Sequence, residues 1–259
     1  AMFADVILPA SAWPEKNGTV SNTNRQVQMG RKALEAPGEA REDWAITCDL
    51  ANRLDLNWTY DTPADVFAEM KLAMPSLDNI TWDRLISEDV VAYPCPAPDH
   101  PGEDIVFSDR FPTATGLGTM VPAKVIPPDE TPDAEYPFIL STGRQLEHWH
   151  TGAMTRRSFV LDAVNPEPVV QMNVADIAKL GIEAGDKVRV ATRRGEVEIM
   201  VRQDDQVPVG AIFIPFAFVE AAANLLTNAA LDPYGKIPEF KFCAARVEPA
   251  GSQQSVAAE

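Results

Sequence analysis

The sequence lacks paired cysteines and long apolar runs. Its three cysteines, Cys48, Cys95 and Cys243, lie far apart, and no C-x-x-C pair occurs. This spacing argues against an iron–sulfur cluster or a structural zinc site within the chain, and single cysteines are typical of a reducing compartment. No run of about 18 apolar residues, the length of a membrane span, occurs. We therefore expect a cytoplasmic protein with no membrane partner and no metal ligands in this chain.

Basic residues are also scarce. The chain has 22 lysines and arginines against 38 aspartates and glutamates, which gives a formal net charge of −16. A chain this acidic repels nucleic acid and anionic membrane surfaces, so we expect no nucleic-acid partner. Any phosphate-bearing ligand must be held by a local basic patch or by backbone amides, against the overall field of the protein.

Residues 1–91 predict the end of an α/β domain. The apolar run 4–8 is expected to form a buried strand that Pro9 ends, and its place at the start predicts that the chain continues a longer one. The opening residues do not resemble a signal peptide. Asn17-Gly18 predicts a hairpin turn whose flanking strands include Thr19, Val20, Val27 and Gln28. Amphipathic helices are expected over 38–54 and 63–74, with a short helix near Trp82.

Nine prolines fall between positions 94 and 132. Such a density excludes a long helix or a central strand, so residues 92–132 are expected to form an extended connector. The domain that follows, residues 133–250, has many short strands with small helices between them, a pattern typical of a β-barrel. Strands are expected over 137–142, 168–173, 186–205 (a hairpin about Arg194-Gly195), 210–216 and 240–249, helices over 174–181 and 219–228, and a disordered tail over 251–259.

The segment Ser141–Arg157, STGRQLEHWHTGAMTRR, carries an unusual local excess of positive charge. Arg144, Arg156 and Arg157 oppose only one acid, Glu147, and two histidines add further donors. Arginine side chains and backbone amides suit a phosphate or pyrophosphate, and Trp149 offers a flat face to a purine or pterin ring. Two other interpretations stay open: a surface loop that packs on itself, and a metal site, for which His148-x-His150 lacks further ligands.

Two stretches of the sequence resemble one known family. The words T-G-R-x-L-E-H-W-H-T-G-x-M-T-R-R and L-G-I-x-x-G-D-x-V-x-V-x-x-R-R-G resemble the dinucleotide-binding C-terminal domain of the dimethyl sulfoxide reductase superfamily. The words A-D-V-I-L-P and E-K-N-G-T-V-S-N-T-N-R-Q, followed by A-P-G-E-A-R-E-D-W, resemble the end of the preceding domain in the same enzymes. Together these stretches cover about 200 residues and occur in the family's order.

The resemblance implies a fold and a cofactor. The fold is the end of an α/β cofactor-binding domain followed by a double-psi β-barrel, and the cofactor is bis(molybdopterin guanine dinucleotide) with molybdenum or tungsten. Iron–sulfur clusters are expected in the part of the enzyme outside this sequence, as is the ligand of the metal. By position, the cofactor-binding residues are Thr142, Gly143, Arg144, Gln145, Leu146, Glu147, His148, Trp149, His150, Thr151, Phe216, Asn224 and Lys241.

The physical roles of the last three residues also have plainer explanations. Phe216 suits a stacking wall but also a core position, Asn224 suits an amide partner, and Lys241 suits either a counter-charge or a solvated strand. Cys243 reads as a small buried residue in an alternating strand. Asn22, Asn24 and Arg25 suit the entrance of an active site or, equally, a simple hairpin turn.

Within the family, the ending I-P-E-F-K-F-C-A-A-R-V-E-P favours a formate dehydrogenase. The resemblance then implies the C-terminal part of a catalytic subunit that oxidises formate and passes electrons through iron–sulfur and flavin subunits to NAD. Its partners are the rest of the catalytic subunit and those NAD-reducing subunits. A periplasmic-type nitrate reductase of the same superfamily is the alternative, and a double-psi barrel that serves as a binding module without redox chemistry is a third possibility.

Overall fold

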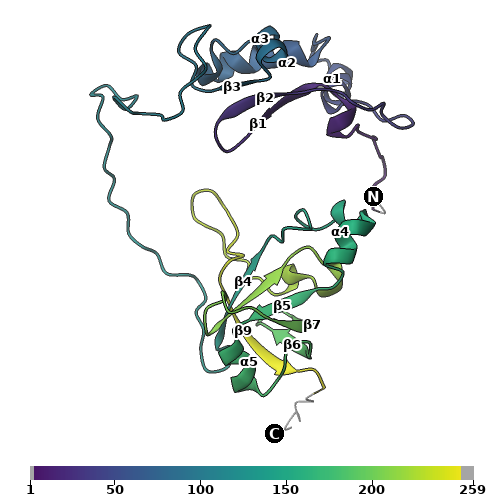
Figure 1. The fold of residues 1–259 in the computed structure, drawn as a ribbon, viewed down its shortest axis with the longest axis vertical. Coiled ribbons are helices and arrows are strands. Elements are labelled where there is room, and N and C mark those ends of the chain that lie inside the picture. Colours follow the sequence, from purple (N-terminus) through teal and green to yellow (C-terminus); the bar gives the residue numbers. More distant parts are fainter. Residues whose placement is uncertain (1–2, 252–259) are drawn as a thin grey trace. The chain divides into compact units, whose positions relative to one another are not determined.

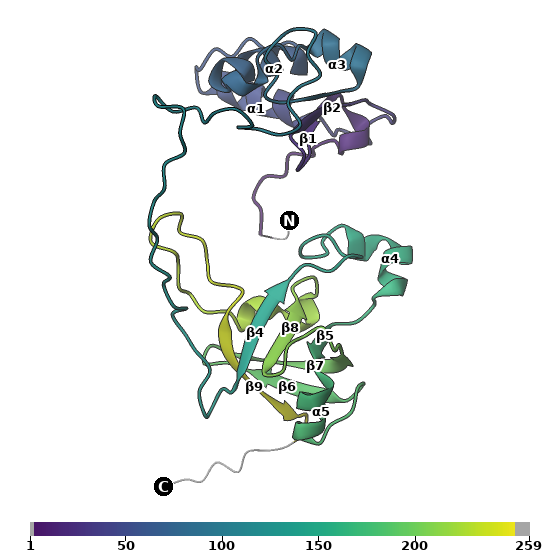
Figure 2. The same cartoon turned by 60° about the vertical axis from the view of Figure 1, so that its left-hand side comes forward.

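The computed structural model describes residues 3–251. The chain divides into two units, Ala1–Val121 and Pro122–Glu259, and each is described by itself (Figures 1 and 2). The predicted disordered tail lies, except for Gly251, outside the described residues. Among the residues that are described, no helix is long and apolar enough to cross a membrane.

The first unit contains a small antiparallel sheet with helices packed around one apolar core. The sheet order is β1-β2-β3, with β1 Gly18–Ser21, β2 Gln26–Gly30 and β3 Val90–Ala92. The helices are α1 Asp43–Arg53, α2 Pro63–Ala73 and α3 Trp82–Glu88, with short 3-10 turns at Trp13–Glu15 and Pro75–Leu77. The core consists of Val27, Phe67, Leu77, Ile80, Leu85, Val91 and Cys95.

The three helices predicted in this unit are confirmed, and local signals explain their ends. At the start of α2, Asp65 Oδ2 accepts hydrogen bonds from the Thr62 amide and hydroxyl, and Pro63 occupies the first turn. Pro63 needs no intrahelical amide partner there, whereas Pro75 cannot continue the helix. Thr81 caps α3 by accepting a hydrogen bond from the Arg84 amide at 3.1 Å.

Two predictions for the start of the chain are wrong. Residues 4–8 form no strand, and Val6, Ile7 and Leu8 are more than half exposed. An apolar run becomes a strand only when it pairs with another strand, and residues 4–8 pair with none of the described strands. The hairpin turn does not lie at Asn17-Gly18: Gly18 is already in β1 and pairs with Gly30. The chain reverses after Ser21, where Asn22 Oδ1 accepts from the Gln26 amide and Arg25 has a φ of 61°.

Arg25, which the sequence left between an entrance role and a turn role, serves the fold of the first unit. Its Nε donates to the Tyr93 carbonyl at 3.0 Å and its Nη2 donates to the Glu103 carbonyl at 2.6 Å. The residue therefore holds the first part of the proline-rich segment against the sheet, because a guanidinium can satisfy several carbonyls at once.

The second unit is a closed barrel of six strands in the order β4-β8-β5-β7-β6-β9. This architecture confirms the predicted fold class, an α/β part followed by a β-barrel. The strands are β4 Phe138–Gly143, β5 Val169–Met172, β6 Lys187–Ala191, β7 Glu196–Gln203, β8 Ala211–Pro215 and β9 Cys243–Pro249. Two neighbouring pairs, β4 with β8 and β5 with β7, are parallel, and the remaining pairs are antiparallel.

The barrel closes around alternating aliphatic side chains. Along β7 every second residue is buried, which fits the period of two expected for a strand with one face on a core. Its core includes Leu140, Val170, Met172, Val188, Val190, Ile212, Ile214 and Cys243, all fully buried. The predicted helix after β5 is confirmed as α5 Val174–Leu180, capped by the Asn173 side chain and ended by Gly181 at a φ of 67°.

The helix predicted over 219–228 does not form. Two 3-10 turns, Val219–Ala221 and Ala223–Leu225, replace it, separated by Ala222 in an extended conformation. The break buries both Ala221 and Ala223, at 1% exposure each, and leaves Val219 on the surface. A continuous helix does not allow this, because its buried positions recur every three to four residues, not at i and i+2.

Candidate functional site

The predicted ligand-binding residues gather where two parallel strands end. In the β4–β8 ladder, Gly143 pairs with Pro215, the last residue of each strand. Parallel strands end at the same edge of a sheet, so the segments that follow, residues 144–158 and 216–226, leave the barrel side by side. The two segments are joined directly by the Phe216 amide, which donates to the Gly143 carbonyl at 3.1 Å.

Gly143 has no space for a side chain. An added Cβ would lie 2.6 Å from a ring carbon of Phe213 and 3.5 Å from the Lys241 Nζ atom. The sequence predicted a glycine that lets a ligand approach the backbone. The structure shows a second reason for glycine at this position, because the Phe213 ring on the neighbouring strand leaves no room for a Cβ atom.

Thr142 and Lys241 lie together although 99 residues separate them in the chain. The Lys241 ammonium donates to the Thr142 carbonyl at 2.6 Å, and the Thr142 hydroxyl donates to the Phe240 carbonyl at 2.9 Å. Thr142 is buried, so its hydroxyl serves this internal contact, whereas Lys241 is exposed. An ammonium group has three N–H donors, and the remaining ones are available to a ligand.

Three more predicted residues form a partly exposed aromatic cluster. The ring centroids of Trp149 and His150 lie 4.6 Å apart, and those of His150 and Phe216 lie 6.2 Å apart. Arg144 is exposed and its Nε donates to His150 Nε2 at 3.3 Å. Across residues 3–251, no acid forms an ion pair with Arg144. An unpaired arginine beside an exposed indole offers both a positive charge and a flat surface.

His148 and Gln145 point into the protein. His148 is fully buried, its Nε2 lies 2.8 Å from the Asn165 carbonyl, and its ring meets Phe218 edge-on at 5.5 Å. Its Nδ1 atom has no hydrogen-bond partner, and neither has the buried Nε2 of Gln145. Buried polar atoms are almost always satisfied, so two orphans in one loop indicate an absent polar group or water.

Thr151, Phe216 and Asn224 line one small hollow of about 160 Å³. Its other walls are Phe218, Val219, Ala222 and Ala223. The hollow is apolar with two polar side chains at its rim, which is the usual character of a small-molecule subsite. Leu146 and Glu147 lie outside this grouping: Leu146 is 96% exposed, and Glu147 is half-buried in the same loop.

Arg156 organises the site although it was not among the predicted ligand-binding residues. It forms ion pairs with Asp162 at 3.0 Å and Glu220 at 2.6 Å, and its guanidinium lies 4.8 Å from the centre of the Phe218 ring. The hydrogen bonds from Arg156 hold the pKa of Glu220 below its usual range. The contacts join the loop after β4 to the loop after β8. The charge excess in Ser141–Arg157 was the sequence signal for this residue, but its acidic partner lies 64 residues away.

The chain offers no cluster of metal ligands in the part that the structure describes. No group of three or more His, Cys, Asp and Glu side chains is arranged there to hold a metal ion. Cys243 is fully buried, as predicted, and its burial raises the pKa of the thiol. A thiol of this kind is a packing group, because the thiolate that binds metals is disfavoured in an apolar interior.

Comparison with known families identifies both parts of the chain. The Molydopterin dinucleotide binding domain matches residues 138–244, and the Molybdopterin oxidoreductase family matches residues 1–53. The barrel thus matches a molybdopterin dinucleotide-binding domain. The chain belongs to the molybdopterin oxidoreductases of the dimethyl sulfoxide reductase superfamily, as the sequence motifs predicted.

Individual relatives cover nearly the whole chain but only part of themselves. The F420-dependent formate dehydrogenase subunit alpha of Methanocaldococcus jannaschii is 44% identical over 96% of this chain, which spans 37% of that protein. The assimilatory nitrate reductase catalytic subunit of Bacillus subtilis is 34% identical over 96% of the chain, which spans 36% of it. Acetylene hydratase from Pelobacter acetylenicus shares the fold, with a TM-score of 0.71, 18% identity, and coverage of 93% of this chain and 38% of that chain.

The residues present fit the cofactor that the family implies, bis(molybdopterin guanine dinucleotide). The orphaned Nε2 of Gln145, the unpaired Arg144 and the exposed face of Trp149 provide donors, positive charge and a stacking surface. A dinucleotide presents ring edges, phosphates and aromatic faces, which these groups match in kind. The assignment of each contact to an individual residue stays a prediction.

Proposed function

We propose that this chain is the cofactor-binding C-terminal portion of a formate dehydrogenase catalytic subunit. The observation that carries the cofactor role is the unpaired Arg144 beside Trp149, His150 and Phe216, at the edge where β4 and β8 end. The formate substrate is supported by three formate dehydrogenase alpha subunits that are 40–44% identical to the chain. The two family matches, which also cover residues 1–53, favour this enzyme over a barrel that acts alone as a binding module.

The proposed reaction converts formate to carbon dioxide, one proton and two electrons. When bound, the pterin-held metal supplies the two-electron chemistry. The residues of this chain hold the dinucleotide: Arg144 and Lys241 supply positive charge, Trp149 and Phe216 supply apolar surface, and the hollow beside Asn224 excludes water from part of it. Binding and orientation of this kind are what a protein contributes to cofactor chemistry.

The electron acceptor is a separate part of the proposal. The sequence motifs led to NAD-reducing iron–sulfur and flavin subunits as partners. The three formate dehydrogenase alpha subunits that are 40–44% identical to the chain are F420-dependent enzymes by name, and they favour F420 over NAD. Iron–sulfur clusters outside this sequence remain part of the proposal in either case.

A nitrate reductase is the second candidate, because the B. subtilis assimilatory enzyme is 34% identical over nearly the whole chain. Turnover by the full-length enzyme separates the two. We expect the enzyme to reduce an artificial acceptor with formate as the donor. With a reduced dye as the donor, we expect its rate of nitrate reduction to be far below its rate of formate oxidation. Nitrate reduction without formate oxidation would reject the formate proposal. Reduction of F420 or of NAD by the intact complex then identifies the acceptor.

A further inference from the structure

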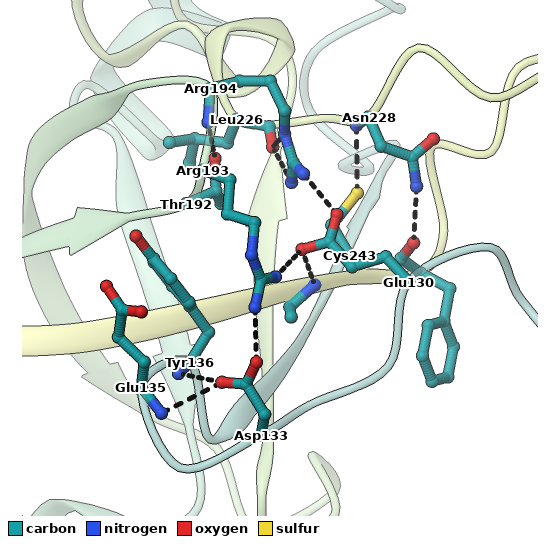
Figure 3. Close-up of polar contacts among 12 residues, drawn as sticks. Glu130, Asp133, Glu135, Tyr136, Thr192, Arg193, Arg194, Leu226, Asn228 and Cys243 are labelled. Carbon is teal, nitrogen blue, oxygen red and sulfur yellow. Dashed lines mark hydrogen bonds and ion pairs between the residues drawn. The ribbon is translucent and has the colours of Figure 1, made fainter.

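An ion-pair network around the largely buried carboxylate of Glu130 joins the proline-rich connector to the barrel (Figure 3). Glu130 lies in this connector, and its side chain is only 13% exposed. Its Oε1 accepts from Arg193 Nη1 at 2.7 Å and from the Ala244 amide at 3.2 Å, and its Oε2 accepts from Arg194 Nη1. One carboxylate therefore binds two arginines of the β6–β7 turn and the backbone of β9.

The contact with Glu130 satisfies the Ala244 backbone amide, which the β6–β9 ladder leaves without an acceptor. The β6–β9 ladder runs from Arg246 to Pro249 on the β9 side, so Ala244 lies beyond its end. A buried backbone amide without a partner is costly, and Glu130 supplies the acceptor that no strand provides. Ala244 is fully buried and follows Lys241 by three residues.

The contact with Arg194 reaches the other side of the site. Arg194 donates from Nη2 to the Leu226 carbonyl at 2.9 Å and from Nε to the same atom at 3.3 Å. Leu226 is fully buried and follows Asn224 by two residues. Gly195 also touches this segment, since a Cβ added there would lie 2.9 Å from the Leu225 carbonyl oxygen.

The connector also forms part of the surroundings of Lys241. Connector residues 126–129 and the loop that contains residues 231–242 line a hollow of about 720 Å³, with Lys241 in its wall. Within 226–244, Asn228 donates its amide to Cys243 Sγ at 3.3 Å and its side chain to Glu239 and the Phe242 carbonyl. The two ends of this loop are thus tied to each other, and Glu130 ties them to the connector.

We propose that Glu130 is a positioning residue for the dinucleotide site: through Arg194 and the Ala244 amide it fixes the two chain segments that carry Asn224 and Lys241. This inference rests on the proposed cofactor-binding function. It assigns the connector a direct part in holding the site, beyond that of linking two units. Residues that hold ligand-binding residues in place affect ligand affinity without contacting the ligand themselves.

The test is a double-variant cycle in the full-length enzyme with Glu130→Gln, Arg194→Gln and both together. Guanine nucleotide and metal content are measured per folded protein, with the rate of nucleotide loss in mild denaturant. We expect each single variant to lose nucleotide about tenfold faster or more, the range for residues that support a ligand-binding group. The double variant should lose nucleotide less than additively, because both changes remove the Glu130–Arg194 contact that the two residues share.

Asp133→Asn is the matched control. Asp133 directly follows the connector and also binds Arg193, but its side chain is 49% exposed and it contacts neither Arg194 nor β9. We expect this variant to retain nucleotide like the unaltered enzyme. Melting temperature and hydrogen exchange distinguish a loss of positioning from general destabilisation. The Glu130→Gln enzyme must lose nucleotide at temperatures at which hydrogen exchange shows that its barrel is folded.

Normal retention in the folded Glu130→Gln enzyme would overturn the inference, as would equal losses in Asp133→Asn. Additive effects of the Glu130 and Arg194 changes would overturn it as well. If the unaltered enzyme itself contains neither metal nor guanine nucleotide, the proposed cofactor function fails, and that result is distinct from a failure of the Glu130 assignment.

Discussion

At the scale of single residues, the site depends on one glycine and one unpaired arginine that follow each other in the chain. Gly143 ends β4 under the ring of Phe213, and Arg144 then turns outward toward His150. The close packing at Gly143 fixes where β4 ends, and it therefore fixes the position from which the Arg144 side chain extends. The packing at Gly143 and the position of the Arg144 charge thus depend on each other.

Gly143→Ala is expected to destabilise the barrel by about 1–3 kcal/mol, the usual cost of overpacking a well-packed region. The new methyl group would have to displace the Phe213 ring, which lies 2.6 Å from the ideal Cβ position. Hydrogen exchange of the amides in the unit that carries each substitution measures the change. Gly18→Ala is the control, since nothing lies within 4 Å of a Cβ there, and its effect should stay within about 0.5 kcal/mol. Equal effects of the two variants would contradict the packing argument.

Arg144→Ala in the full-length enzyme is expected to lower its guanine nucleotide content. The change removes a charge-assisted contact with a phosphate, worth about 1.5–3 kcal/mol, or roughly tenfold or more in affinity. Acid release of the nucleotide, normalised to protein, provides the measurement. Lys179→Ala, which removes an exposed positive charge from α5, serves as control. Full nucleotide content in the Arg144 variant would remove this residue from the site.

At the scale of elements, the sequence predicted correctly those helices and strands that local contacts and local residue patterns determine. The residues that precede α2, α3 and α5 are Thr62, Thr81 and Asn173, so the contacts that start these helices are local in the sequence. The barrel strands followed from alternation and from β-branched residues.

The elements that were predicted wrongly depend on partners distant in the chain. The apolar run at residues 4–8 pairs with none of the described strands. The segment 219–228 breaks into two turns because the barrel buries both Ala221 and Ala223. Contacts between distant residues also limited the prediction of the site. The loop after β4 was evident from the sequence. The pairing of Arg156 with Glu220 and of Glu130 with Arg194 became visible only in the tertiary fold.

The loop between Leu231 and Pro238 is expected to lose order in acid. Asp232 accepts hydrogen bonds from the amides of Ile237, Gly235 and Tyr234, and these bonds hold its pKa below the usual 3.8. A carboxyl group with a lowered folded-state pKa stabilises the fold above its unfolded value and loses this effect as the pH falls through the folded value. Amide exchange at Gly235 and Ile237 should therefore be protected at pH 5 and become faster than the intrinsic pH trend predicts below about pH 4.

Asp232→Asn provides the control for this pH dependence, because an amide side chain does not titrate. The variant is expected to show weaker protection at pH 5 and no further loss in acid. An unchanged acid response in Asp232→Asn would assign the effect to another group.

At the scale of the whole molecule, the chain spans only part of the length of its relatives. It covers 37% of the M. jannaschii protein. The proposed function assigns this chain the holding of the cofactor and not the oxidation of formate. We therefore expect the 259-residue chain alone to show no formate oxidation, and measurable turnover by it would contradict this assignment.

The central claim is that the loop edge of the barrel holds a pterin guanine dinucleotide. Metal analysis of the purified full-length protein, combined with quantification of guanine nucleotide released by acid, tests it most directly. We expect molybdenum or tungsten together with two guanine nucleotides for each metal ion, as the prefix bis in the cofactor name requires. A folded protein prepared from cells supplied with molybdate and tungstate that contains neither metal nor guanine nucleotide would contradict it.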